Sequence, residues 1–193
     1  MINNGGTCSL DPTPSSGKNN IHTTVAMNAQ QFYGSEACGL CLEVTGNGEG
    51  VGTKSIQGTF NVFVNNLCPE CKKGDLDLGL NGDGRWKIEW KAIACNVDGP
   101  INYFFQGSNP YYIKVQARNY RHPVSKFAII QNGVRKYLSR TQDNFFISKG
   151  DINFPIYPPF VVELTSMKNE VLTDIISKFE NGIAIVGGKQ FET

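Results

Sequence analysis

The sequence predicts an all-β protein in two parts, cross-linked by disulfide bonds. Residues 86–94 and 112–119 alternate apolar and polar side chains, as β-strands with one buried face do. Asn132-Gly133 stands between two apolar runs, which is the strongest short-range signal for a β-hairpin. Six cysteines, 21 glycines and only 18% charged residues favour a secreted disulfide framework.

The first part is predicted to span residues 1–98 and to be built on short strands. Residues 1–20 form a turn-rich loop by composition, and residues 22–31 are expected to form a short helix. Strands are expected at three places: 41–46, 59–64 and 86–94. A glycine-rich loop is expected at 46–52, and the turn residues of 95–100 mark the boundary with the second part.

The second part, residues 99–193, is predicted to be β throughout. Its expected strands, two of them within one hairpin, lie in five segments: 112–119, 127–138, 160–167, 171–176 and 183–188. Lys168-Asn169 supplies a turn between two of these strands. Short strands at this spacing predict a β-sandwich.

The loop at residues 65–79, NNLCPECKKGDLDLG, holds the residues most suggestive of chemistry. In an extended chain, residues two apart point the same way. Asp75 and Asp77 would therefore project from one side while Leu76 and Leu78 anchor the other. A lone pair of this kind is more often a surface charge or a turn than a catalytic group, so the pattern alone favours no activity.

Charge and hydropathy limit the classes of partner. The formal net charge of +1 gives no preference for nucleic acid or for an anionic membrane, whereas a neutral sugar polymer fits. No apolar run approaches the ~20 residues of a membrane helix. The first residues, MINNGGTCSLD, have neither the basic start nor the apolar core of a signal peptide. We expect either a cytosolic protein or a chain whose true N-terminus is missing.

The cysteines allow three interpretations. CGLC at 38–41 and CPEC at 68–71 have the spacing of a zinc site, although the 26 residues between them exceed the usual gap of about 15–20. Zinc would leave Cys8 and Cys95 without a role. A thioredoxin-like pair needs a βαβ context that the sequence lacks. Disulfides are therefore favoured over zinc, and a metal site is not expected.

Five segments occur in an order that resembles the expansins, especially the compact expansin-like proteins. They are GGTCSLDP, FYGSEACGLCLEVTG, the loop with LCPE and GDLDL, GSNPYYIKVQARNYRHPV, and RTQDNFF. The resemblance covers nearly the whole chain. It implies a six-stranded double-ψ β-barrel, related to glycoside hydrolase family 45, followed by an immunoglobulin-like β-sandwich that binds glucan. Expansins are secreted and loosen plant-type cell walls without detectable hydrolysis.

The resemblance assigns expected roles to several residues. Asp77, in the pattern G-x-L-D-L, falls on the family's essential barrel carboxylate, which is the general acid in the hydrolase relatives. Asn66 falls where the family usually has an aspartate. Tyr111 and Tyr112 fall on two positions of the aromatic row that binds glucan, and Asp143 stands at the third.

The same resemblance implies the disulfide pairs Cys8–Cys38, Cys41–Cys95 and Cys68–Cys71. In the loop, Glu70 is the only other carboxylate besides Asp75 that could accompany Asp77. Asp75 is too close in sequence to act as an opposing partner. Inverting glycosidases need an acid and a base about 6.5–9.5 Å apart, so no glycosidase chemistry is expected.

Two departures from the family pattern lie in the first part. The family's barrel begins with a T-Y-x-G strand, and this chain starts at Met1, immediately after the place where that strand should lie. The short helix that follows the family's D-L-S pattern is also missing, since Gly79 runs almost directly into NGDGRW. We therefore expect a barrel without its first strand, in a fragment or an incomplete gene model.

Three functional hypotheses remain open at this stage. The first is a non-hydrolytic, wall-loosening, monomeric expansin-like protein that binds cellulose or another β-glucan, without a cofactor and with neither nucleic acid nor membrane as partner. The second is a glucan-binding module that has lost loosening activity, and the third is a residual β-glucan hydrolase.

Overall fold

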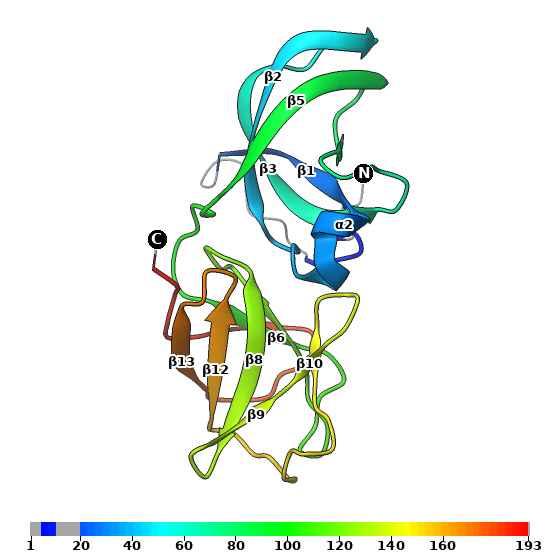
Figure 1. Ribbon diagram of the computed structural model, residues 1–193. Helices are drawn as coiled ribbons and strands as arrows, with labels where there is room; N and C mark the ends of the chain where they lie inside the picture. The colour runs from blue at the N-terminus through cyan, green and yellow to red at the C-terminus, as the bar shows by residue number, and fades with distance from the viewer. Residues whose placement is uncertain (1–4, 11–19, 193) are drawn as a thin grey trace. The chain divides into compact units, whose positions relative to one another are not determined.

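Residues 5–10 and 20–192 are described by a computed structural model, which divides the chain into two compact units (Figure 1). The first unit consists of Met1–Tyr33 and Ala37–Asn96, and the second of Gly34–Glu36 and Val97–Thr193. The main division follows Asn96, two residues before the boundary that the sequence predicts. No helix in the described ranges is long and apolar enough to cross a membrane.

The first unit is built on one five-stranded sheet with the order β4-β1-β3-β2-β5. β1 and β3 run parallel, and the other neighbouring pairs are antiparallel. The strands are β1 (Ile21–Asn28), β2 (Cys41–Gly52), β3 (Gln57–Cys68), β4 (Leu76–Leu78) and β5 (Gly84–Ile93). A single turn of helix, α2 (Ala29–Phe32), and a short 3-10 turn, η1 (Tyr33–Ser35), follow β1.

The short helix expected at residues 22–31 is wrong for most of its length, because residues 21–28 form β1. Thr23, Thr24 and Val25 are β-branched and favour the pleated backbone of a strand. β1 also pairs with a strand on each side, which outweighs any local helical preference. Helix begins only at Ala29, where the side-chain oxygen of Asn28 accepts a hydrogen bond from the backbone N–H of Gln31 at 3.1 Å.

The prediction of a loop at residues 46–52 is also wrong, because β2 continues through these residues alongside β5 (Figure 1). The pairing shifts register between Gly46 and Gly50, as at a β-bulge. Gly50 pairs with Trp86, and a Cβ there would stand 2.2 Å from the carbonyl oxygen of Arg85. The glycines therefore permit a close approach of two strands.

Three disulfide bonds cross-link the first unit: Cys8–Cys38, Cys41–Cys95 and Cys68–Cys71. These are the pairs that the resemblance to expansins implies. Cys41 lies at the start of β2, so its bond to Cys95 ties this strand to the segment after β5. With all six sulfurs bonded in pairs and no free cysteine, the zinc interpretation has no thiolate ligands.

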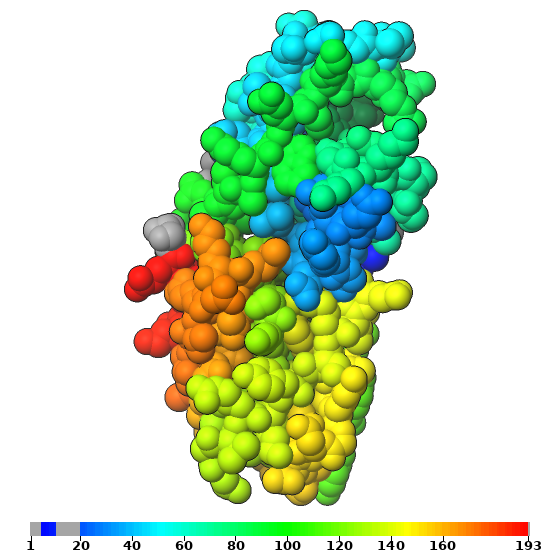
Figure 2. Space-filling view, in the orientation of Figure 1, coloured from blue at the N-terminus to red at the C-terminus, as the bar shows by residue number. Residues whose placement is uncertain are grey.

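The second unit is a sandwich of two antiparallel sheets, which agrees with the predicted all-β fold class. One sheet has the order β10-β11-β7-β6-β14 and the other β13-β12-β8-β9. The strands are β6 (Asn102–Phe105), β7 (Lys114–Arg118), β8 (Val124–Gln131), β9 (Val134–Tyr137), β10 (Ser139–Arg140), β11 (Phe146–Ile147), β12 (Phe160–Ser166), β13 (Val171–Ile176) and β14 (Ala184–Val186). The side chains of β12 and β13 cover adjoining parts of one face (Figure 2).

The core of the second unit lies between its sheets. Tyr103, Phe105, Phe127 and Leu164 are all buried there. The hairpin predicted at Asn132-Gly133 is confirmed, since it joins β8 to β9. Both turn residues have positive φ, 49° and 77°, which is the conformation that this dipeptide adopts readily. This core fixes the strands that carry the aromatic residues described below.

Candidate functional site

Asn66, Ala26 and Asp77 stand in one row across three neighbouring strands of the first unit, and we call these residues the carboxylate row. Ala26 of β1 pairs with Asn66 of β3 on one side and with Asp77 of β4 on the other. Paired residues project from the same face of a sheet. With strands about 4.8 Å apart, the two outer residues are about 10 Å apart. Ala26 between them is buried and has only a methyl side chain.

Asp77 is the exposed member of the row. It lies between the half-buried Leu76 and Leu78, so the alternation along β4 has the phase that the sequence predicts. Within the described part of the chain, its carboxylate has no hydrogen bond or ion pair. The two oxygens are therefore available to a ligand.

Asn66 is held by the segment before Cys8. Its Oδ1 accepts hydrogen bonds from the backbone N–H of Thr7 at 2.9 Å and from the Thr7 hydroxyl at 2.6 Å. Gly6 permits this contact, because a Cβ there would stand 2.4 Å from the carbonyl oxygen of Asn65. An amide cannot act as a general base. Asn66 can still donate from Nδ2 to a ligand.

Asp75 belongs to a turn and not to the row. Its Oδ2 accepts from the backbone N–H of Lys72 at 3.1 Å, while its own N–H donates to the Lys72 carbonyl at 2.9 Å. Asp75 is exposed, as is Glu70 in the preceding turn. The two aspartates of the loop therefore differ: the Asp75 carboxylate accepts a backbone hydrogen bond, and Asp77 faces solvent.

The turn at residues 109–112, between β6 and β7, carries the two adjacent tyrosines, and we call it the tyrosine turn. Asn109 and Tyr112 exchange two backbone hydrogen bonds, of 2.8 and 3.1 Å, around Pro110 and Tyr111. The Asn109 side chain accepts a third from the N–H of Tyr111 at 2.9 Å. Tyr111 is 65% exposed and Tyr112 38%, whereas Ile113 is fully buried. The isoleucine, and neither tyrosine, fills the core at this point.

Asp143 is engaged in an ion pair. Its Oδ2 is 3.1 Å from the ammonium of Lys114, which also lies 4.4 Å from the centre of the Phe145 ring. The Thr141 hydroxyl donates to Oδ1. Partial burial by itself would raise the pKa of Asp143, but the hydrogen bonds from Thr141 and Lys114, with the lysine charge, outweigh it and lower the pKa. Asp143 is thus a fixed carboxylate where an aromatic residue is expected.

The known proteins to which this chain is similar are expansins. No family model matches the chain. The chain is 27% identical over 190 residues to Expansin-YoaJ of Bacillus subtilis (strain 168), and the match covers 90% of this chain and 73% of the relative. The chain is therefore similar to an expansin over most of its length.

Solved structures of Clavibacter michiganensis expansin show the same fold. A mutant in complex with cellohexaose superposes with a TM-score of 0.79 and the apo protein with 0.77, each at 21% identity. Both comparisons cover 97% of this chain and 89% of the bacterial protein. The expansin fold thus extends over both units.

From the sequence, Trp90 was predicted only as part of an alternating strand. Its indole N–H donates to the carbonyl oxygen of Gly74 at 2.8 Å, so β5 reaches the loop before Asp77. On the other side of this loop, the Gln31 side-chain oxygen accepts from the N–H of Gly74 at 2.9 Å. The alternation placed Trp90 on one face of β5, but only the folded chain reveals its contact.

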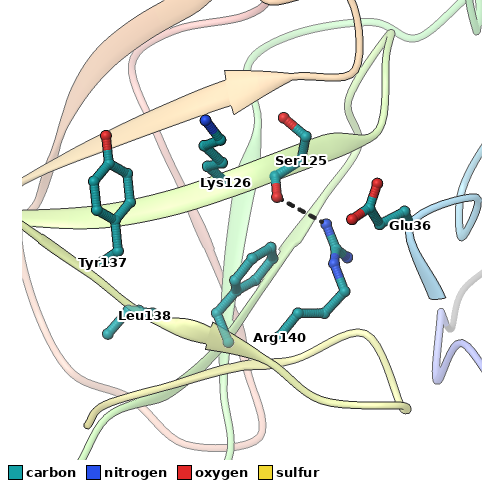
Figure 3. A pocket seen from close by; sticks show the side chains of 7 residues that line it. Glu36, Ser125, Lys126, Tyr137, Leu138 and Arg140 are labelled. Carbon is teal, nitrogen blue, oxygen red and sulfur yellow. Dashed lines mark hydrogen bonds between the residues drawn. The ribbon is translucent and has the colours of Figure 1, made fainter. Parts of the chain in front are cut away.

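A pocket in the second unit lies beside Arg140 (Figure 3). It is lined by Glu36, Ser125, Lys126, Tyr137, Leu138, Arg140 and Phe146. The Arg140 guanidinium donates to the carbonyl oxygen of Val124 and, at 2.5 Å, to the side-chain oxygen of Asn144. It also lies 4.5 Å from the Phe146 ring. These contacts hold the arginine as a structural group.

The described residues contain no cluster of three or more His, Cys, Asp or Glu side chains that could hold a metal ion. The candidate ligand-binding residues are therefore the carboxylate row of the first unit and the tyrosine turn of the second.

Proposed function

We propose that this expansin-like protein binds cellulose or another β-glucan and loosens the wall that contains it without hydrolysing the polymer. The observation that carries the proposal is the carboxylate row, in which a ligand-accessible carboxylate faces an amide. The exposed tyrosine turn supports a sugar polymer as the partner. We further propose that the protein acts outside the cell as a monomer without a cofactor, since three disulfides suit an oxidising compartment.

Tyr111 and Tyr112 are the proposed attachment to the polymer. A tyrosine offers an apolar ring face and a polar rim, which suits a pyranose ring. The turn around Pro110 is closed by two backbone hydrogen bonds, so the rings are attached to a defined backbone. With a net charge of +1, attraction to a polyanion is not needed to explain binding, and neither nucleic acid nor membrane is proposed as partner.

Asp77 is the proposed loosening residue. An exposed carboxylate accepts hydrogen bonds from sugar hydroxyls through two oxygens. Competition of this kind weakens the hydroxyl contacts between neighbouring glucan chains. Asn66 would contribute as a donor from the opposite side of the row, since its oxygen already accepts from Thr7.

Hydrolysis is not proposed, because it needs a second carboxylate. An inverting glycosidase uses an acid and a base about 6.5–9.5 Å apart. At the corresponding position, the row has the amide of Asn66. Asp75 is occupied by the Lys72 turn. Glu70, which is exposed in the loop, is the remaining local carboxylate for the hydrolase alternative.

A glucan-binding module without loosening activity is the second candidate. It is favoured by the same Asn66 amide, which stands where the family usually has an aspartate. The Lys114–Asp143 ion pair bears on affinity instead, because it occupies the third position of the expected aromatic row. Retention on cellulose without wall creep would establish this candidate.

The test measures three properties of one protein preparation: retention on microcrystalline cellulose, creep of wall strips, and release of reducing sugars. We expect retention and creep without sugar release. The double variant Tyr111→Ala, Tyr112→Ala should lose retention, whereas Tyr137→Ala, which removes a 48%-exposed tyrosine from β9, should keep it. Failure of the unaltered protein to bind any β-glucan would refute the proposal, and sugar release would replace it with the hydrolase alternative.

A further inference from the structure

The loop between β11 and β12 is fastened to the tyrosine turn at two points. At one end, the Ser148 N–H donates to the Ile113 carbonyl at 2.9 Å, and the Ile113 N–H donates to the Ser148 hydroxyl at 3.1 Å. At the other end, the Ile156 N–H donates to the Pro110 carbonyl at 2.7 Å. Both ends of the segment 148–156 are therefore held against the turn, while Asn153 between them is bonded to Gln131 of β8.

Tyr157 is the exposed residue of this second attachment. Ile156 is buried at 5% exposure, whereas Tyr157 is 63% exposed, close to the 65% of Tyr111. Prolines at positions 155, 158 and 159 restrict the backbone on both sides of the tyrosine. An isolated exposed aromatic residue needs no explanation, but this one directly follows the residue that is bonded to Pro110, which itself directly precedes Tyr111.

We propose that Tyr157 is a third stacking residue for the glucan chain, on the same surface as Tyr111 and Tyr112. The proposal rests on the proposed function. Backbone groups joined by an N–H···O bond belong to residues whose Cα atoms are about 5–6 Å apart. Tyr157 follows Ile156 and Tyr111 follows Pro110, so the two tyrosines are one residue beyond a bonded pair.

The third position of the family's aromatic row gives a reason for such a residue. That position is Asp143, whose carboxylate is paired with Lys114 and presents no ring. A chain with two tyrosines alone would have less stacking area for an extended polymer. Tyr157 supplies a ring from a different loop, held by the Ile156–Pro110 hydrogen bond, and not from the turn between β10 and β11 that carries Asp143.

The experiment compares Tyr157→Ala and Tyr157→Phe with the unaltered protein. Binding to microcrystalline cellulose is measured by depletion, and binding to cellohexaose by calorimetry. We expect Tyr157→Ala to weaken binding by about two- to tenfold, the range for losing one aromatic contact. Tyr157→Phe should bind within about twofold of the unaltered protein, since the ring face remains. Tyr137→Ala is the matched control, and thermal unfolding establishes that each variant is folded.

The outcomes separate this proposal from the function on which it rests. If Tyr111→Ala weakens binding and Tyr157→Ala does not, Tyr157 has no role and the proposed function stands. If the unaltered protein binds neither ligand, both fail together. Equal losses in Tyr157→Ala and Tyr137→Ala would indicate a general effect of surface tyrosines and would also overturn the proposal.

Discussion

Replacement of Asp77 by asparagine should reduce wall loosening and leave cellulose retention unchanged. The side chain keeps its size and one acceptor oxygen but loses its charge. Asp77 is exposed and has no hydrogen bond or ion pair within the described ranges, so the change removes no protein contact there. The free energy of unfolding should therefore change by no more than about 0.5 kcal/mol.

The expected size of the effect follows from the two kinds of hydrogen bond. A bond to a charged group contributes about 1.5–3 kcal/mol and a neutral one about 0.5–1.5 kcal/mol. At an exposed site the lower ends apply, and the difference is about 1 kcal/mol per sugar contact. One such contact lowers the population of the loosened state about fivefold, and two bonds from the same carboxylate lower it further.

Creep of wall strips under constant load is the assay, run with equal amounts of bound protein. Asp75→Asn is the control, because asparagine can also accept the hydrogen bond from Lys72. Its creep should match that of the unaltered protein. Undiminished creep in Asp77→Asn would refute the proposed role of Asp77 in loosening. Soluble sugar that the unaltered protein releases and the Asp77 variant does not would reveal a hydrolase.

Other predictions concern the ion pair and a disulfide. Asp143→Trp should raise affinity for cellulose in the depletion assay, because it places a ring at the third row position; unchanged affinity would mean that the position is misaligned. The folded pKa of Asp143 is lowered, so its contribution to stability is present above the unfolded value of about 3.8 and is lost as the pH falls through the lower folded value. In Asp143→Asn, the free energy of unfolding measured in urea should depend less on pH in this acid range. Replacing Cys41 and Cys95 together by alanine should cost about 3–4 kcal/mol in urea unfolding, since their bond closes 54 residues; a loss below about 1 kcal/mol would contradict the chain-entropy estimate.

Alternation along the chain predicted elements well where one face of a strand is buried. Residues 86–94 fall almost entirely within β5, and Asn132-Gly133 forms its hairpin, because both signals are local. The helix predicted at residues 22–31 was wrong for the opposite reason. Their conformation is decided by β3 and β4, strands distant in sequence, whose pairing a local pattern does not contain.

The candidate site was predictable residue by residue but not as an arrangement. The resemblance to expansins singled out Asp77, within the GDLDL pattern, and Asn66 as its counterpart. Their position on either side of Ala26 depends on the register of three strands. Tyr157 was missed because its significance depends on one backbone hydrogen bond, from Ile156 to Pro110. No periodicity in the sequence carries that information.

The contacts of Gly74 have a consequence for the thermodynamics of binding. The loop before Asp77 is held through both backbone groups of this glycine, by Gln31 on one side and Trp90 on the other. Ordering a free segment on binding costs about 1–2 kcal/mol of conformational entropy per residue. Because this loop is already tied down on folding, the protein avoids most of that entropy loss when it meets a polymer. More of the interaction energy then remains for separating one glucan chain from the next.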